Sequence, residues 1–292
     1  MVRTLASTMT ASVLRWALDC LGHGKSVVIA TVIDTSGSVP GKVGARIAMT
    51  DLGGEWVGTV GGAGLEMNVL NRCNELIKSH SKPFGEVLTF GLNKSAKGYE
   101  VKPLDSLCGG RVTLSIEVMI PMPHILIMGG GHCGLALAET IHSLGWSFSV
   151  HDTRHEFCNS ELYPNAKNLY FQSVSELLES IDENKFSHFS DILLLGHDWS
   201  EDQQRLLGIL SKSMQYNVKL DGDRAPRLGV IGSRSKWKSF QKECLSHGIS
   251  QKLLDTVICP IGLNIGAESP EEIAIAVVAQ IMSFYKEINP SD

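Results

Sequence analysis

The stretch from His124 to Asp152 constrains the fold of this chain more than any other. An apolar run at residues 125–128 leads into a glycine loop, and a segment with the apolar spacing of a helix follows the loop. Gly145 ends that helix, and residues 146–150 alternate like a second strand. A strand, a glycine loop, a helix and a strand within roughly 30 residues are the order of a dinucleotide-binding unit. The sequence therefore predicts a Rossmann-like domain.

The glycines of this loop fit the pattern G-x-G-x-x-G, in which each has its own role. Gly129 permits the tight turn, Gly131 lets backbone amides approach a pyrophosphate, and Gly134 lets the helix pack closely on the strand. The free amides at the start of the helix favour an anion. Asp152 stands where a carboxylate could bind a ribose 2′-hydroxyl, which favours NAD, although Arg154 could accept a 2′-phosphate instead.

The ligand of this loop remains open between NAD(P), another phosphate-bearing molecule and none. His132 and Cys133 lie inside the loop and are polar enough to alter what binds. Four histidines could gather at the same crevice: His132, His151, His155 and His197. With Asp152 and Asp198 they could hold a metal ion, although solvated residues at strand ends are the plainer interpretation.

Composition indicates a globular protein with more than one domain. The 292 residues suffice for two domains with separate cores, and 43% of them are apolar and 20% charged. The net charge of −5 and the dispersed basic residues argue against a nucleic-acid surface. No apolar run is long enough to span a membrane, and the N-terminus lacks the apolar core of a signal peptide. Seven widely spaced cysteines without a C-x-x-C pair favour a reduced, cytoplasmic protein.

The segment Pro121-Met122-Pro123 predicts a boundary between a domain of residues 1–120 and a domain of residues 124–292. Strands alternate with helices in the second domain, which predicts a parallel sheet with helices on both faces. Ser269, followed by a proline and an acid at the third helical position, predicts the start of the last helix. Ser173 with Glu176, and Ser200 with Gln203, have the spacing of a capping box and predict two further helix starts.

The first domain reads as a mixed α/β domain that opens with an amphipathic helix at residues 8–21. It holds a second glycine-rich segment, Gly61-Gly62-Ala63-Gly64, between a strand and a helix that carries Glu66 in its first turn. Such a turn can bind an anion, because exposed amides converge on it. Close backbone packing without a ligand explains the glycines equally well.

A polar loop later in the first domain carries Cys108, Gly109 and Gly110. The two glycines would allow a ligand to approach the thiol of Cys108. A lone cysteine is nevertheless more often structural than reactive.

Taken together and in order, these motifs resemble the XdhC/CoxI family of accessory proteins for xanthine dehydrogenase and related molybdenum hydroxylases. The resemblance covers almost the whole chain. It rests on Gly37-Ser38-Val39-Pro40, Gly44-Ala45-Arg46, the segment Gly61 to Glu66, Cys108-Gly109-Gly110, the loop Gly129 to Gly134, Gly229 to Arg234, and Cys259 to Ala274.

The resemblance implies a protein that binds molybdenum cofactor, supports its sulfuration by a cysteine desulfurase and inserts it into the apo-hydroxylase. It implies an XdhC/CoxI-type domain at residues 1–120, a homodimer, and a cofactor chaperone rather than an enzyme. The cofactor's phosphate would suit the helix start near Gly64 and the cation Arg46. Its soft metal–dithiolene centre would suit the Cys108 thiolate as a molybdenum ligand.

Another class of function stays open beside this one. The glycine fingerprint with Asp152 would also suit an NAD(P)-dependent oxidoreductase, but the sequence offers no identifiable proton donor or hydride acceptor site. A dinucleotide sensor that gates cofactor release by the first domain is a further hypothesis.

Overall fold

The computed structural model describes residues 2–3, 10–50, 54–93, 101–104, 109–220 and 226–286. The chain forms two compact units, Met1–Pro121 and Met122–Asp292. Their boundary falls within the Pro121-Met122-Pro123 segment. Among the described residues no helix combines the length and the apolar character that crossing a membrane requires.

The first unit is built on a seven-stranded sheet of order β1-β4-β3-β2-β7-β5-β6. Its elements are β1 (Val2–Arg3), α1 (Thr10–Gly22), β2 (Val27–Ser36), β3 (Arg46–Thr50), β4 (Glu55–Gly58), α2 (Ala63–Ser79), β5 (Phe84–Gly91), β6 (Val101–Pro103) and β7 (Arg111–Met119). The central strands are antiparallel, whereas β1 pairs with β4 and β5 pairs with β6 in parallel.

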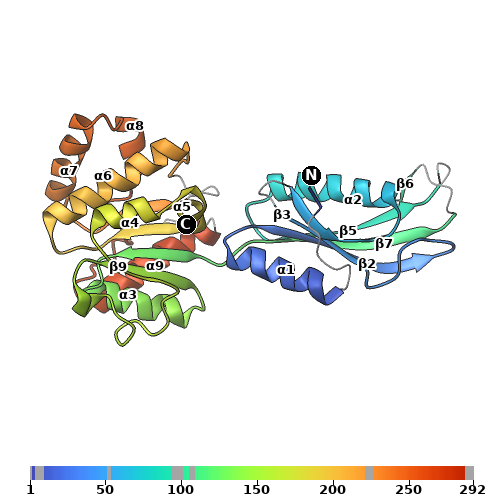
Figure 1. Ribbon diagram of the computed structural model, residues 1–292, viewed down its shortest axis with the longest axis horizontal. Coiled ribbons are helices and arrows are strands. Elements are labelled where there is room, and N and C mark those ends of the chain that lie inside the picture. Colours follow the sequence, from blue (N-terminus) through green and yellow to red (C-terminus); the bar gives the residue numbers. More distant parts are fainter. Residues whose placement is uncertain are drawn as a thin grey trace. The chain divides into compact units, whose positions relative to one another are not determined.

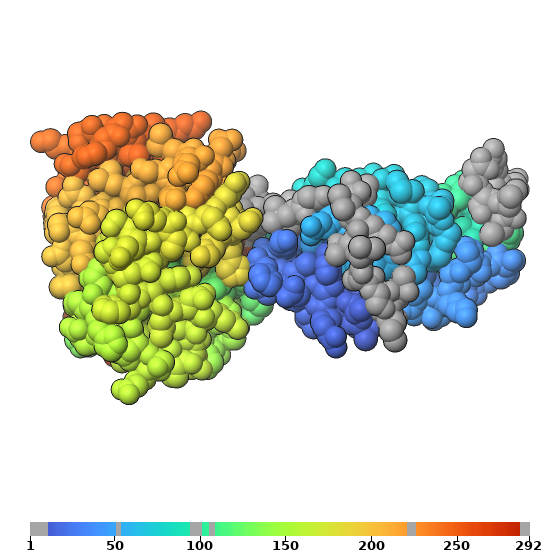
Figure 2. All heavy atoms as spheres, in the orientation of Figure 1, coloured from blue at the N-terminus to red at the C-terminus, as the bar shows by residue number. Residues whose placement is uncertain are grey.

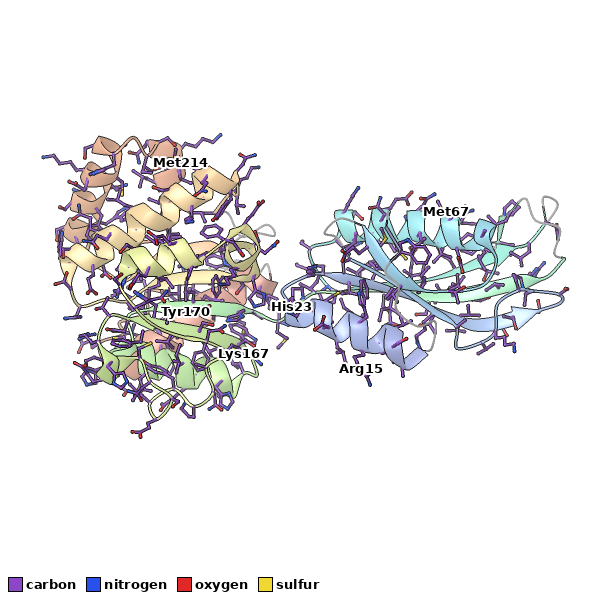
Figure 3. All side chains as sticks on the ribbon, viewed as in Figure 1. Arg15, His23, Met67, Lys167, Tyr170 and Met214 are labelled. Atoms are coloured by element: carbon purple, nitrogen blue, oxygen red, sulfur yellow. The ribbon has the colours of Figure 1, made fainter. Side chains whose placement is uncertain are left out.

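Helices α1 and α2 cover opposite faces of this sheet (Figure 1). Alternation along β2 explains how, because Val28 packs on the side of α2 and Val27 on the side of α1. Arg15 on α1 and Met67 on α2 point away from the sheet on its two sides (Figure 3). The outer face of α1, dark blue in Figure 2, leaves Leu18 69% exposed.

The second unit is built on a five-stranded parallel sheet of order β10-β9-β8-β11-β12. Its strands are β8 (His124–Met128), β9 (Ser147–Asp152), β10 (Leu169–Phe171), β11 (Asp191–Leu194) and β12 (Arg227–Val230). Its helices are α3 (His132–Ser143), η1 (His155–Phe157), α4 (Val174–Ser180), α5 (Glu183–His188), α6 (Trp199–Tyr216), α7 (Arg234–Ser246), α8 (Gln251–Leu254) and α9 (Pro270–Lys286).

This strand order confirms the predicted Rossmann-like unit. The chain steps outward from β8 to β9 and β10, then returns to the other side of β8 for β11 and β12. In sheets of this kind ligands bind outside the carboxyl ends of the strands at such a reversal, which here lies between β8 and β11. The mixed α/β fold class predicted for the whole chain is likewise confirmed.

Helices cover both faces of the parallel sheet, which explains why all five residues of β8 are buried. Ile125 and Ile127 pack with α3 and α9, and Leu126 and Met128 pack with the layer that includes α4, α6 and α7 (Figure 1). Burial of such side chains contributes about 1.5–3 kcal/mol each, so this strand anchors the second core.

Of the two helix starts predicted at Ser269 and Ser200, the structure confirms the first and not the second. Ser269 accepts the amide of Glu272, and its own amide donates to the Glu272 carboxylate, so α9 begins as predicted. The start of α6 was predicted wrongly, because Asp198 and not Ser200 accepts the capping bond, from the amide of Glu201 at 2.9 Å. Ser200 instead donates its hydroxyl to Asp198. The carboxylate therefore moves the helix start two residues earlier.

Candidate functional sites

Three glycine-bearing segments of the first unit meet at one end of its sheet, and we call them the glycine cluster: residues 37–41, 61–62 and 109–110. A methyl group on Gly61 would lie 2.6 Å from the Cα atom of Gly41, and one on Gly110 would lie 2.4 Å from a methyl of Val39. Segments far apart in the sequence therefore touch through positions where only hydrogen fits.

The turn at Gly61 and Gly62 is held by Thr59, which motif reading did not single out. The Gly61 amide donates to the Thr59 hydroxyl at 3.2 Å, and that hydroxyl donates to the Glu66 carboxylate. Both glycines have positive φ angles, 88° and 77°, which any other residue adopts at a cost. The only sequence signal for Thr59 is a hydroxyl residue just ahead of two glycines.

Hydrogen bonds of Thr59 connect two of the predicted site residues, Glu66 and Arg46, to the glycine cluster. Glu66 stands in the first turn of α2 and accepts from the Thr59 hydroxyl, so this carboxylate organises the turn. Arg46 opens β3, and its carbonyl accepts the Thr59 amide at 2.8 Å. The Arg46 guanidinium turns back to the carbonyl of Gly44 at 3.4 Å.

The start of α2 is open to solvent. Gly62, Ala63 and Gly64 are exposed, and among the described residues no side chain caps the helix. A methyl group on Gly64 would meet nothing within 4 Å, so packing does not require a glycine there. The amides of the first helical turn have no partner within the helix.

The predicted thiol, Cys108, lies outside the described residues. Its neighbour Gly109 is exposed, and Gly110 is buried in the cluster. Arg111, which opens β7 beside them, is exposed as well. It adds a cation next to the cluster that the sequence patterns did not indicate.

The second site is the glycine turn of the Rossmann-like unit, where β8 faces β11. Gly129 has a φ of 127°, and a methyl group on it would lie 2.7 Å from the amide of Gly196. A methyl group on Gly134 would lie 2.3 Å from the carbonyl of Gly129, inside the close contact of α3 with the turn. Gly131 differs from both, since a methyl group there would meet nothing within 4 Å.

Asp152 ends β9 and is bound on all sides by the protein. Its Oδ2 accepts the Gly130 amide and Arg154 Nη2, each at 2.9 Å. Its Oδ1 accepts the Arg154 amide at 3.0 Å and Arg154 Nε at 2.9 Å. Burial opposes the charge, but the bonds from Arg154 and Gly130 outweigh it and hold the pKa of Asp152 below its usual value. The carboxylate is therefore ionised and only 1% exposed.

Both backbone polar groups of Gly130 are hydrogen-bonded within the protein. Its amide donates to Asp152, and its carbonyl accepts the Tyr163 hydroxyl at 2.7 Å. A methyl group on Gly130 would lie 2.0 Å from the carbonyl of Phe157. The residues after β9 thus close around the turn, and the amides left for an anion are those at the start of α3.

His132 and Cys133 form that start, and no described side chain caps it. His132 is exposed and Cys133 is partly buried. Burial, together with the charge of Glu271, raises the pKa of Cys133, so its thiol is protonated at neutral pH.

A buried ionic network lies against Gly196, just after β11. Arg205 of α6, 1% exposed, pairs with Asp202 at 3.1 Å and with Glu201 at 3.0 Å, and Lys236 of α7 pairs with Asp202 at 2.8 Å. Gly196 leaves room for it, because a methyl group there would lie 2.1 Å from Asp202. The spacing of Glu201, Asp202 and Arg205 along α6 is visible in the sequence, but the burial of Asp202 and Arg205 and the link to Lys236 of α7 depend on the fold.

His151 in β9 stands beside this network. Its Nε2 bonds the carbonyl of Gln172 at 3.0 Å, and its Nδ1 is buried without a partner among the described residues. Burial, and then the charge of Arg205, lowers its pKa to about 4. The imidazole is therefore neutral at physiological pH.

The described residues contain no group of three or more His, Cys, Asp or Glu side chains placed to hold a metal ion. The four histidines considered for such a site have separate surroundings. His155 stacks edge-on against Phe171, and His197 lies 3.5 Å from Arg154 Nη1. The described structure therefore gives no support to a metal site in this crevice.

Fold and sites together define a class: an α/β protein with a glycine-clustered mixed sheet in one unit and a Rossmann domain in the other. Residues 125–281 match the family model of the XdhC Rossmann domain, and residues 20–91 match that of the XdhC and CoxI family. The chain belongs to the XdhC/CoxI family, as its motifs had indicated.

Two curated relatives are longer than this chain. The uncharacterized protein YqeB of Escherichia coli is 27% identical over 87% of this chain and 42% of its own length. A Bacillus subtilis protein, named as a probable xanthine dehydrogenase subunit, is 29% identical over 59% of this chain and 46% of its own length. The chain thus spans less than half of either relative.

A solved structure, described as a xanthine dehydrogenase from Bacillus halodurans, is similar over 96% of this chain and 97% of its own. The sequence identity is 18% and the TM-score is 0.47.

Proposed function

We propose that this protein takes part in the maturation of a xanthine dehydrogenase-type molybdenum hydroxylase. It binds molybdenum cofactor in the first unit, supports its sulfuration by a cysteine desulfurase, and inserts it into the apo-hydroxylase. In this proposal it is a carrier and not an enzyme in its own right. Family membership supports the role, and the name of the Bacillus subtilis relative links the family to xanthine dehydrogenase.

The observation that carries the proposal is the meeting of the three glycine segments. Two of the glycine motifs, at residues 61–62 and 109–110, each touch the loop at residues 37–41. Gly62 and Gly109 are exposed, as is Gly64 just beyond the cluster, so the cluster is accessible to a ligand. A cofactor that combines a phosphate, a flat pterin and a metal needs contacts of several kinds at one place, and such a cluster can provide them.

The side chains around the cluster would contact different parts of such a ligand. Arg46 opens β3 and Arg111 opens β7 next to Gly110, and these two cations suit the phosphate. Glu66 would repel a phosphate, and its bond from Thr59 gives it a structural role instead. Cys108, next to Gly109 in the chain, is the soft ligand proposed for molybdenum.

Cofactor content tests the proposal directly. The protein is expressed in a host that makes molybdenum cofactor, purified without oxygen, and assayed for molybdenum and for pterin fluorescence after oxidation. We expect both in the parent and in Cys259→Ala, a matched control in the second unit, and loss of both in Cys108→Ala. Cofactor retained by Cys108→Ala would move the metal contact away from the thiol, and none on the parent would refute cofactor binding.

Delivery is tested with partners. An apo-hydroxylase should gain activity from the loaded protein, and more when a cysteine desulfurase and cysteine are supplied. A loaded protein that activates nothing would bind cofactor without inserting it. We also propose a homodimer, with the exposed face of α1 as its contact. Sedimentation should then give twice the chain mass for the parent and the chain mass for Leu18→Glu.

A second function, dinucleotide binding by the second unit, is favoured by the reversal of strand order between β8 and β11. We propose it as a sensor that alters cofactor release by the first unit. Its test is the rate of cofactor release with and without added dinucleotide. Equal rates would reject the sensor.

A further inference from the structure

The end of β9 is where a Rossmann unit distinguishes one dinucleotide from another, by binding the adenosine ribose. A free ribose diol donates its hydroxyls to a carboxylate, whereas a 2′-phosphate accepts from cations. Donors and acceptors left unfilled at this position therefore decide which ligand fits.

Asp152 has no acceptor capacity to spare. A carboxylate offers about four lone-pair directions. Asp152 fills them with the amides of Gly130 and Arg154 and with two bonds from the Arg154 guanidinium. A ribose hydroxyl could bind only by breaking one of these bonds, which disfavours the predicted contact of Asp152 with the ribose of NAD.

Arg154, by contrast, has donors to spare. The guanidinium carries five N–H groups, and its side chain gives Nε and Nη2 to Asp152. The described contact of Nη1 is His197 Nε2 at 3.5 Å, and that histidine is exposed. The ring of Phe157, 4.1 Å away, supports the guanidinium from one face, so Arg154 is held in place while 28% of its side chain remains exposed.

We infer that Asp152 is a structural support of the glycine turn, and that Arg154 with His197 selects a dinucleotide whose adenosine ribose carries a 2′-phosphate. This inference rests on the second proposed function and is independent of cofactor binding by the first unit. The class of ligand is a 2′-phosphorylated adenine dinucleotide.

Neighbouring carboxylates set how tight this binding can be. The negative charges of Glu156 and Glu201, in addition to that of Asp152, attract the Arg154 guanidinium and raise its pKa. Glu201 is itself bound by the Thr153 hydroxyl at 2.7 Å and by Arg205, which offsets its charge. The inference therefore concerns preference between two ligands, and it predicts modest affinity for the preferred one.

Calorimetric titration of the whole protein with NADP⁺ and NAD⁺ tests the preference. We expect NADP⁺ to bind on the order of tenfold more tightly, as one or two charge-assisted bonds would give. The fragments 2′,5′-ADP and 5′-ADP should show the same order. Arg154→Gln should abolish the difference, and Lys252→Gln, which removes an exposed cation from α8, should keep it.

Arg154→Gln also removes the main partner of Asp152 and could unfold the turn. A second variant therefore tests the same preference without this change. His197→Asn changes an exposed side chain and should weaken NADP⁺ binding several-fold while leaving NAD⁺ binding unchanged. Asp152→Asn should lower the melting temperature of the second unit with or without ligand. Tighter binding of NAD⁺ than of NADP⁺, lost selectively in Asp152→Asn, would overturn the inference. So would no binding of either dinucleotide, whatever the cofactor content of the first unit.

Discussion

Each unit contains a glycine-rich turn between a strand and an uncapped helix, but the two turns are held differently. In the first unit the amide of Gly61 is bound by the partly exposed hydroxyl of Thr59, which lies in the same local segment and in turn donates to Glu66. In the second unit the amide of Gly130 is bound by Asp152, a buried carboxylate from the next strand.

The difference shows that similar glycine patterns can have unequal capacity for a ligand. In the second turn, the carboxylate predicted to bind a ribose accepts a hydrogen bond from the turn itself, from the amide of Gly130. The carbonyl of Gly130 is bound as well, by the Tyr163 hydroxyl. The first turn uses one hydroxyl and leaves Gly64 exposed with open space around it. Stability in the second unit should therefore depend on buried polar groups near the turn, and in the first unit it should not.

Acid should separate the two units more than any substitution. Burial lowers the pKa of His124, at the start of β8, to about 3 and that of His151 to about 4. Both folded-state pKa values lie below the unfolded value of about 6.5. The neutral forms stabilise the second unit above that pH, and this stability is lost as pH falls from about 6.5 toward 4. The loss is on the order of 3 kcal/mol for each histidine.

Hydrogen exchange resolved by peptide measures this effect in each unit separately. After correction for intrinsic rates, protection in the second unit should fall between pH 6.5 and 4, while protection in the first unit changes little. His124→Asn should make the second unit less dependent on pH, whatever its absolute stability. Equal losses in both units would contradict the assignment of this pH dependence to the two buried histidines of the second unit.

Gly130→Ala should give the next largest effect. Its methyl group would lie 2.0 Å from the Phe157 carbonyl, against backbone that cannot rotate away. Overpacking of this kind costs about 1–3 kcal/mol or more. Urea unfolding followed by circular dichroism should show the loss, and Gly131→Ala, one residue further on in open space, should lose less, because only the helix cap is weakened there. Equal stability of the two variants would mean that the turn is not held as described.

The contrast also shows how far the sequence alone could go. The glycine positions predicted the Rossmann unit, because the G-x-G-x-x-G spacing requires a particular strand–turn–helix geometry. The role of Asp152 was not predictable in the same way. Its position suits a ribose in any such unit, and only the folded chain shows that Arg154, two residues later, turns back on it.

The glycine cluster was predictable in its members and not in its arrangement. Glycine motifs in the first half indicated places where backbone or ligand comes close, but they could not say which. The structure shows backbone contact for Gly61 and Gly110, and open space for Gly64. Thr59 was missed because a single hydroxyl near glycines is common, and its bond to Glu66 depends on how α2 is oriented on the turn.

Thr59→Val tests the network that holds the first turn. The change keeps the shape of the side chain and removes the hydroxyl between the Gly61 amide and the Glu66 carboxylate. The expected loss of stability is about 1 kcal/mol, because both groups are partly exposed and water replaces the bonds in part. Thr59→Ser should restore most of it in the same urea titration. A serine variant as weak as the valine variant would assign the effect to packing of the methyl group.

Gly64→Ala should produce the smallest change and a change of opposite sign. The methyl group has room, and alanine in place of glycine in a helix raises stability by about 0.4–1 kcal/mol. Close packing does not require a glycine at position 64. The variant therefore tests the other explanation of this glycine, which is the approach of a ligand. If the cofactor approaches the start of α2 closely, a stabilised Gly64→Ala protein should carry less molybdenum and pterin than the parent. If its cofactor content equals that of the parent, the ligand contact lies elsewhere in the cluster, at the backbone around Gly109.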